Sequence, residues 1–136
     1  MNYDPNPKKG YFFPLPNEIF SLGLSGTAIA IYAYLMRLED RKSHQCHPAY
    51  GTIAKAIGCS IGTVSKYVSE LCERKLISVK HTSVLISKGE KHNGTLNYTI
   101  LPIRVAVDYY NACQLQKIEE AKAEQNMQMR LEELNS

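Results

Sequence analysis

Residues 57–71 read IGCSIGTVSKYVSEL, and this stretch decides the fold. Gly58 can adopt the left-handed conformation that ends a helix, and Ser60 is a residue type that caps the next one. Apolar residues then recur at the spacing of one helical face. They are Ile61, Val64, Val68, Leu71 and Cys72. The stretch therefore predicts a helix end, a tight turn and a second helix to about residue 75, with Val64, Val68 and Leu71 turned inward.

The segment before this turn supplies a matching helix. Pro48 is predicted at the first helical position, where its missing amide costs nothing, and the helix continues through Ile57. Ile53 faces inward, and the small Ala54 lets the two helices cross closely. Together these features predict a helix-turn-helix. An ordinary helical hairpin within a core is the alternative, and it leaves the outward Ser, Thr and Lys residues unexplained.

The residues after the two helices change from a helical to a strand-like period. Apolar and polar residues alternate over residues 77–82 and 96–100. Turn signals at Lys88-Gly89 and Asn93-Gly94 lie between them. We therefore expect a hairpin with a long basic tip at residues 83–95, in the position of a wing. The predicted class is mainly α with a small β-hairpin, a winged helix-turn-helix domain over residues 25–101.

Two further segments flank this domain in a chain of 136 residues, the length of one domain with tails. Residues 1–24 are predicted to form an N-terminal arm and an extended, proline-containing segment, with one helical turn at residues 17–20. Ser25 then caps a buried, largely apolar helix. Residues 102–136 form the C-terminal segment. Its composition, without Gly or Pro from residue 104 to residue 134, predicts a long helix.

The stretch at residues 57–71, followed by Lys75-Leu76-Ile77, resembles the recognition segment of bacterial winged-helix regulators of the GntR-like and MarR-like kind. The shared pattern is G-x-S-x-x-T-V and then L-x-x-x-x-L-I. Residues 13–20, with Leu24-Ser25 and a Tyr-Leu-Leu-Arg series from residue 32 to residue 41, are similar to helix-turn-helix domains of phage and conjugative elements and of plasmid replication initiators. The resemblance implies DNA binding. It departs at Ile61-Gly62, where many relatives carry Arg or Lys.

The distribution of charge also indicates an anionic partner. Residues 41–91 carry nine basic and three acidic residues and three of the four histidines, and the fourth, His92, follows directly. From residue 104 to the end, four basic residues stand against six acidic ones. A basic block of this kind is where nucleic acid docks, so double-stranded DNA is the expected partner. A solvated surface of mixed charge is the alternative that charge alone leaves open.

The outward positions of the second helix are predicted to face the major groove of DNA. Lys66 can reach guanine O6 and N7 or a phosphate, and Thr63 can reach a base edge or a thymine methyl group. Ser60 and the amides of the first turn suit a phosphate, and the wing would reach the flanking backbone. The predicted DNA-binding residues are Ser60, Gly62, Thr63, Ser65, Lys66, Ser69, Lys55, Lys88, Lys91 and His92.

Other kinds of site find little support in the sequence. The His44-x-Cys46-His47 cluster lacks a second pair of ligands at Cys-x-x-Cys spacing, so no metal is expected. No phosphate loop, paired carboxylates or nucleophile with a base can be identified, so we expect no enzyme activity, cofactor or small-molecule ligand. The four cysteines are predicted to be small buried thiols. Without a signal sequence or a long apolar run, a cytoplasmic protein with no membrane contact is expected.

One recognition helix covers only a few base pairs, so a homodimer on a pseudo-palindromic site is predicted. The C-terminal helix is the expected contact because apolar residues lie near one of its faces. They are Ile103, Val107, Tyr110, Ile118 and Ala121. The expected function is sequence-specific transcriptional regulation. An accessory factor for replication initiation or a mobile element is one alternative, and a winged-helix module that binds proteins is another.

Overall fold

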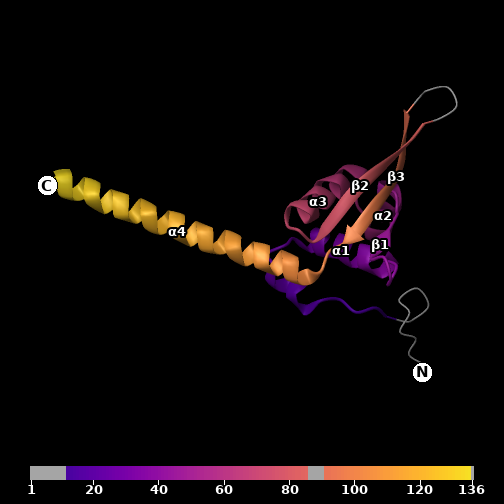
Figure 1. The fold of residues 1–136 in the computed structure, drawn as a ribbon, viewed down its shortest axis with the longest axis horizontal. Helices are drawn as coiled ribbons and strands as arrows, with labels where there is room; N and C mark the ends of the chain where they lie inside the picture. The colour runs from indigo at the N-terminus through magenta and orange to yellow at the C-terminus, as the bar shows by residue number, and fades with distance from the viewer. Residues whose placement is uncertain (1–11, 86–90, 136) are drawn as a thin grey trace.

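The computed structural model describes residues 12–85 and 91–135, with the backbone alone described at residues 82–85 and 91–95. Figure 1 shows a group of helices beside a small sheet, with a long helix leading away from both. The elements are η1 (Asn17–Ser21), α1 (Gly26–Leu38), β1 (Gln45–Cys46), α2 (Tyr50–Ile57), α3 (Ile61–Glu73), β2 (Ile77–Leu85), β3 (Lys91–Ile100) and α4 (Ile103–Asn135). This arrangement confirms the predicted fold class.

The core is built around α1. Its N-terminus is capped by Ser25, whose hydroxyl accepts a hydrogen bond from the Ala28 amide at 3.2 Å, and this satisfies one of the N–H groups that a helix start leaves unpaired. Four side chains of α1 are buried: Ala28, Ile31, Tyr32 and Leu35. Helices α2 and α3 both pack against α1. Ile19 and Leu22 from the preceding segment complete this side of the core.

A tight turn joins α2 to α3. Gly58 adopts a left-handed conformation with φ of 84°, and its amide donates a hydrogen bond to the Ala54 carbonyl at 2.8 Å. Two residues later the Ser60 hydroxyl accepts a hydrogen bond from the Thr63 amide at 3.1 Å. The predicted glycine turn and serine cap are therefore confirmed, and together they fix where α3 begins.

Two local predictions are wrong. Pro48 lies outside α2, which starts at Tyr50 with Ala49 at its N-cap. The fixed φ of proline suits extended backbone as well as a first helical turn, so its identity alone does not locate the helix start. The cysteines also differ from expectation, because Cys46 is buried whereas the other three are only half-buried. All four are free thiols.

The sheet is larger than the sequence predicted. Strand β2 pairs antiparallel with β3 from Ile77 opposite Ile100 out to Leu85 opposite Lys91, with a register shift between His81 and Ser83. Most of the expected tip at residues 83–95 is therefore strand, since pairing across the hairpin overrides the local Asn-Gly turn signal. The short β1, which was not predicted, pairs with the other edge of β3.

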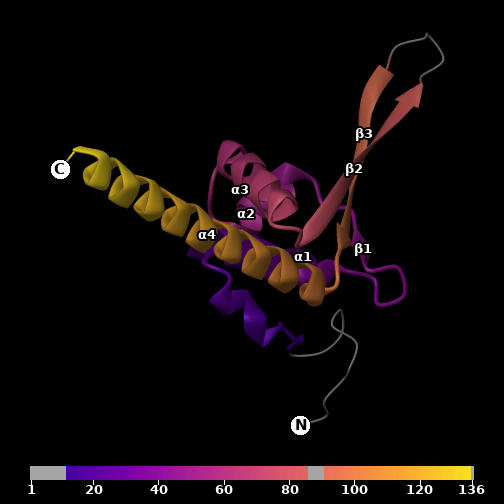
Figure 2. The same cartoon turned by 60° about the vertical axis from the view of Figure 1, so that its left-hand side comes forward.

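Helix α4 has a packed beginning and an exposed remainder. Ala106 is buried, and Val107 and Tyr110 pack against the core. Helix η1 lies beside this part of α4, as Figure 2 shows. From Leu115 to the end every described side chain of α4 is exposed, so this part projects away from the domain (Figure 1). No helix in the described ranges is long and apolar enough to cross a membrane.

Candidate nucleic-acid interface

The surface of α3 divides into a buried row and an exposed row. Val64, Val68 and Leu71 are buried against the other helices. The opposite row contains the positions that the sequence assigned to DNA. Ser60, Gly62, Ser65, Lys66 and Ser69 are exposed and Thr63 is half-buried, while Lys55 is exposed on α2. Small polar side chains and one lysine thus line an accessible helix face, which is the shape that a major groove admits.

Hydrogen bonds organise the first turn of α3. The Ser60 hydroxyl accepts the Thr63 amide hydrogen and lies 2.8 Å from the Thr63 hydroxyl. The Ser60 carbonyl accepts a hydrogen bond from the Val64 amide. Within the described chain, the amides of Ile61 and Gly62 therefore remain available as hydrogen-bond donors at the start of α3. The helix dipole also favours an anion at this end of the helix. A phosphate oxygen fits this position.

Lys66 supplies positive charge to the exposed row. Its ammonium nitrogen lies 5.3 Å from the centroid of the Tyr67 ring. A cation–π contact at an exposed site stabilises by about 0.5–1 kcal/mol, whereas a good contact with a base edge discriminates by about 1–3 kcal/mol. Lys66 can therefore leave Tyr67 for a guanine at small cost.

The hairpin carries the remaining predicted residues. Lys91 and His92 lie on β3, where their backbones pair with Leu85 and Val84 of β2, and Lys88 lies outside the described residues. Figures 1 and 2 show that β2 and β3 extend well beyond the helices. Lys80 and His81 are exposed on β2 and were missed as candidates. The alternating pattern at residues 77–82 had already placed both residues on a strand of the wing, so the sequence could have identified them as candidate DNA contacts.

Residues 22–77 match the family model described as a helix-turn-helix domain. This match covers α1, α2 and α3 and ends where β2 begins, and the β2–β3 hairpin follows directly. Together these elements form a winged helix-turn-helix fold. The predicted helix-turn-helix thus agrees with the family model.

Several solved structures resemble the chain distantly. A possible transcriptional regulator from Methanosarcina mazei Go1 is 15% identical with a TM-score of 0.48, over 77% of this chain and 82% of that one. The S. aureus MepR–DNA complex is 18% identical with a TM-score of 0.41, over 86% of each chain. The repressor AdcR of Streptococcus pyogenes is 13% identical with a TM-score of 0.38, over 80% of this chain and 72% of that one. No curated protein matches the sequence. Such remote likeness carries no argument about what this chain binds.

Arg74 and Lys75, which belong to the basic block of residues 41–91, contact α4 or the segment beside it. The Arg74 guanidinium donates a hydrogen bond to the Leu22 carbonyl and lies 5.2 Å from the Tyr110 ring centroid. The Lys75 ammonium lies 5.8 Å from the Tyr109 ring centroid. These cations help to hold α4 on the domain, so the charge count of the sequence overstates what the exposed face of α3 can offer to DNA.

Ile61 shares the apolar spacing of α3 but is not covered by the core. It lies in register with Val64 and Val68, yet 58% of its surface is exposed. It is the first residue of α3. Helical periodicity shows which side of a helix a residue occupies, but it does not show whether a neighbouring element reaches far enough to cover it.

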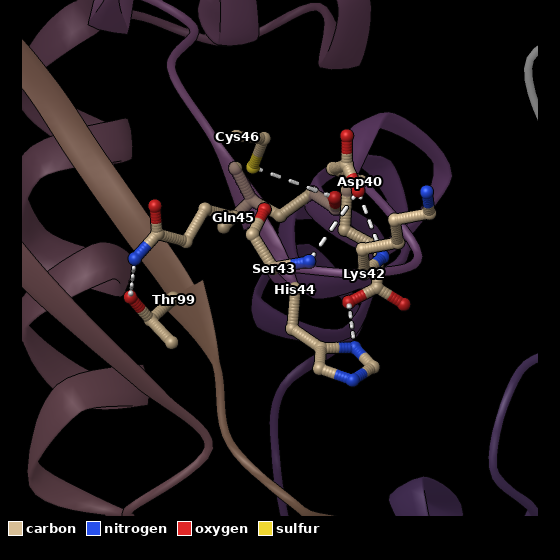
Figure 3. Close-up of polar contacts among 9 residues, drawn as sticks. Asp40, Lys42, Ser43, His44, Gln45, Cys46 and Thr99 are labelled. Carbon is tan, nitrogen blue, oxygen red and sulfur yellow. Dashed lines mark hydrogen bonds and ion pairs between the residues drawn. The ribbon is translucent and has the colours of Figure 1, made fainter.

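Of the residues considered for metal, His44 lies in the connection between α1 and β1, Cys46 lies in β1, and His47 follows β1. Figure 3 shows the contacts around His44 and Cys46. The Cys46 thiol donates to the Leu35 carbonyl at 3.6 Å, and His44 Nδ1 lies 3.5 Å from Glu39 Oε2. Burial raises the pKa of Glu39, and the neighbouring His44 opposes that rise. Within the described ranges, no three His, Cys, Asp or Glu side chains are grouped as metal ligands. These contacts shape the loop that leads into β1.

Proposed function

We propose that this protein binds double-stranded DNA sequence-specifically and acts as a transcriptional regulator. The observation that carries the proposal is the exposed row of α3, from Ser60 to Ser69, which lies opposite the row buried in a winged helix-turn-helix domain. In this docking mode the second helix of the motif enters the major groove. The β2–β3 hairpin extends beyond the helices and can reach the adjacent backbone.

Each part of the proposed interface has a different task. Lys66, near the middle of α3, faces base edges, where a guanine offers two acceptors, O6 and N7. The amides of the first turn of α3 and the ammonium of Lys55 bind phosphates, which position the helix without reading sequence. Lys88, Lys91 and His92 are assigned to the flanking backbone from the hairpin. Specificity therefore resides in α3, and much of the affinity resides outside it.

A homodimer completes the proposal. Beyond residue 114 every described side chain of helix α4 is exposed, although helices in proteins gain most of their stability from packing. Ile103, Val107 and Tyr110 of the predicted dimer face already pack against the core, so the contact lies further along α4. An exposed apolar stripe is available there, at i, i+4, i+8 and i+11. Its residues are Ala123, Met127, Leu131 and Leu134.

Each copy of the chain carries the same stripe, so the stripes of two copies can pack against each other in a symmetric contact, as a two-fold dimer requires.

Replacing Lys66 and the hairpin lysines separately tests the division of labour. Lys66→Ala is expected to weaken binding to a site selected from randomised duplexes by about 1–3 kcal/mol and to bring its affinity closer to that for scrambled DNA. Lys88→Ala combined with Lys91→Ala is expected to weaken all duplexes alike. It should also make the slope of log affinity against log salt shallower by about two units.

Fluorescence anisotropy with selected and scrambled duplexes at several salt concentrations measures both effects. Lys122→Ala, at an exposed position on the projecting part of α4, is the matched control and should leave both quantities unchanged. An unaltered ratio of selected to scrambled affinity in Lys66→Ala would show that α3 does not read sequence through this residue. Absence of duplex binding by the unmodified protein at low salt would refute the proposed function as a whole.

A further inference from the structure

Ile61 stands apart from the residues around it. It continues the row of Val64, Val68 and Leu71, which are at most 3% exposed, yet its own exposure is 58%. It is a large apolar side chain at the start of α3, within a surface otherwise made of Ser, Thr, Gly and Lys. Single exposed apolar residues are common on proteins. The position of this one, at the end of the helix that approaches DNA, requires a closer explanation.

The neighbours of Ile61 explain why the core does not cover it. A Cβ atom placed on Gly51 of α2 would lie 4.0 Å from Ile61 Cδ1, so one end of the isoleucine rests over a glycine. The next residue, Gly62, has no side chain either. Two glycines therefore flank Ile61, and larger residues at these positions would shield it. The isoleucine protrudes from the interface instead of filling a gap between α2 and α3.

The side-chain hydroxyls of the same helical turn pair with each other. The hydroxyls of Ser60 and Thr63 lie 2.8 Å apart, and Ser60 also accepts the Thr63 amide hydrogen. Gly62 offers no side-chain donor or acceptor. The remaining side chain of this turn is that of Ile61, which is apolar and 58% exposed, so it is free to contact a partner. The apolar feature that the major groove presents is the 5-methyl group of thymine.

We propose that Ile61 is a specificity-determining residue that packs against a thymine methyl group. This inference rests on the proposed DNA binding and adds a base preference to it. The N-terminal residues of a recognition helix are those that contact base edges in helix-turn-helix complexes. Burying Ile61 against the methyl group removes apolar surface of both partners from water, which favours thymine over cytosine at that position.

Replacing thymine by deoxyuridine tests the contact because the two bases differ by this methyl group alone. Each thymine of a site selected from randomised duplexes is replaced in turn, and the Kd is measured for the unmodified protein and for Ile61→Ala. Burial of one methyl group stabilises enough to change Kd about three- to five-fold. One thymine in each half-site should show this loss with the unmodified protein, and Ile61→Ala should bind both duplexes equally at that position.

Met129→Ala is the matched control, because Met129 is 60% exposed on the projecting part of α4 and lies on the side opposite Met127. It should discriminate thymine from uracil as well as the unmodified protein does. If no replacement by uracil weakens binding, or if Ile61→Ala keeps the full discrimination, the inference is wrong while DNA binding stands. If no duplex binds at all, the proposed function fails, and this inference fails with it.

Discussion

Gly58→Ala probes the turn that orients α3. Gly58 has φ of 84°, a region that costs an ordinary L-residue about 1–2 kcal/mol. A Cβ atom built there meets nothing within 4 Å, so no steric clash adds to the backbone cost. Alanine also restricts the unfolded chain, which returns about 0.4–1 kcal/mol. The expected net loss in the free energy of unfolding is therefore about 1 kcal/mol.

Urea unfolding followed by circular dichroism measures this loss as a change in midpoint with a constant slope. Gly58→Asn is the informative companion, because asparagine tolerates the left-handed region better than alanine and should lose less stability. A loss above about 3 kcal/mol for Gly58→Ala would reveal a steric contact that the structure does not contain. No loss at all would show that residue 58 has an ordinary helical or extended conformation.

Two further predictions concern α4 and the α1–β1 connection. Sedimentation at tens of micromolar should show a dimer. Met127→Glu should disrupt this dimer, whereas Met129→Glu, on the opposite side of α4, should not. A monomer both with and without DNA would refute the proposed dimer. Because burial raises the pKa of Glu39, its protonated form favours folding, and that stability is lost as pH rises through the raised pKa. Glu39→Gln should therefore unfold at higher urea than the unmodified protein near pH 7, and this difference should shrink toward pH 4. Glu132→Gln, which is exposed, should change little, and an equal effect of Glu39→Gln at both pH values would refute the electrostatic explanation.

The sequence predicted the parts of the fold that have local chemical causes. Ser25 and Ser60 accept hydrogen bonds from the first turns of their helices, and Gly58 adopts the left-handed turn, as their residue types indicated. Such features depend on neighbours within four residues, so they can be recognised without the tertiary structure. The same holds for the continuous helix after Pro102, where nothing interrupts favourable helical composition.

The errors arose where distant segments decide the outcome. Asn93-Gly94 is a strong turn signal, yet the pairing of Ser83 with Asn93 places it within the sheet. Strand β1 contains only Gln45 and Cys46, and it exists because β3 offers an unpaired edge beside it. Neither segment carries a local strand pattern of its own. Long-range pairing overrides local preference in sheets more readily than in helices. The two strands of the hairpin were therefore predicted to be shorter than they are.

The number of basic residues available for DNA links the proposed DNA interface to the proposed dimer. Arg74 and Lys75 contact α4 aromatic rings, so the basic residues left for DNA on one copy are chiefly Lys55, Lys66 and Lys80, together with the hairpin lysines. Because Lys66 is assigned to base edges, the lysines proposed to contact phosphates in one copy are Lys55, Lys80, Lys88 and Lys91. Four phosphate contacts would give one copy a salt slope of roughly −3 to −4. In the proposed dimer, two copies on one duplex would double the number of contacts, and each copy would add its own proposed thymine contact through Ile61. Pairing through α4 would then raise both the affinity and the base preference of a domain that offers few cations to DNA.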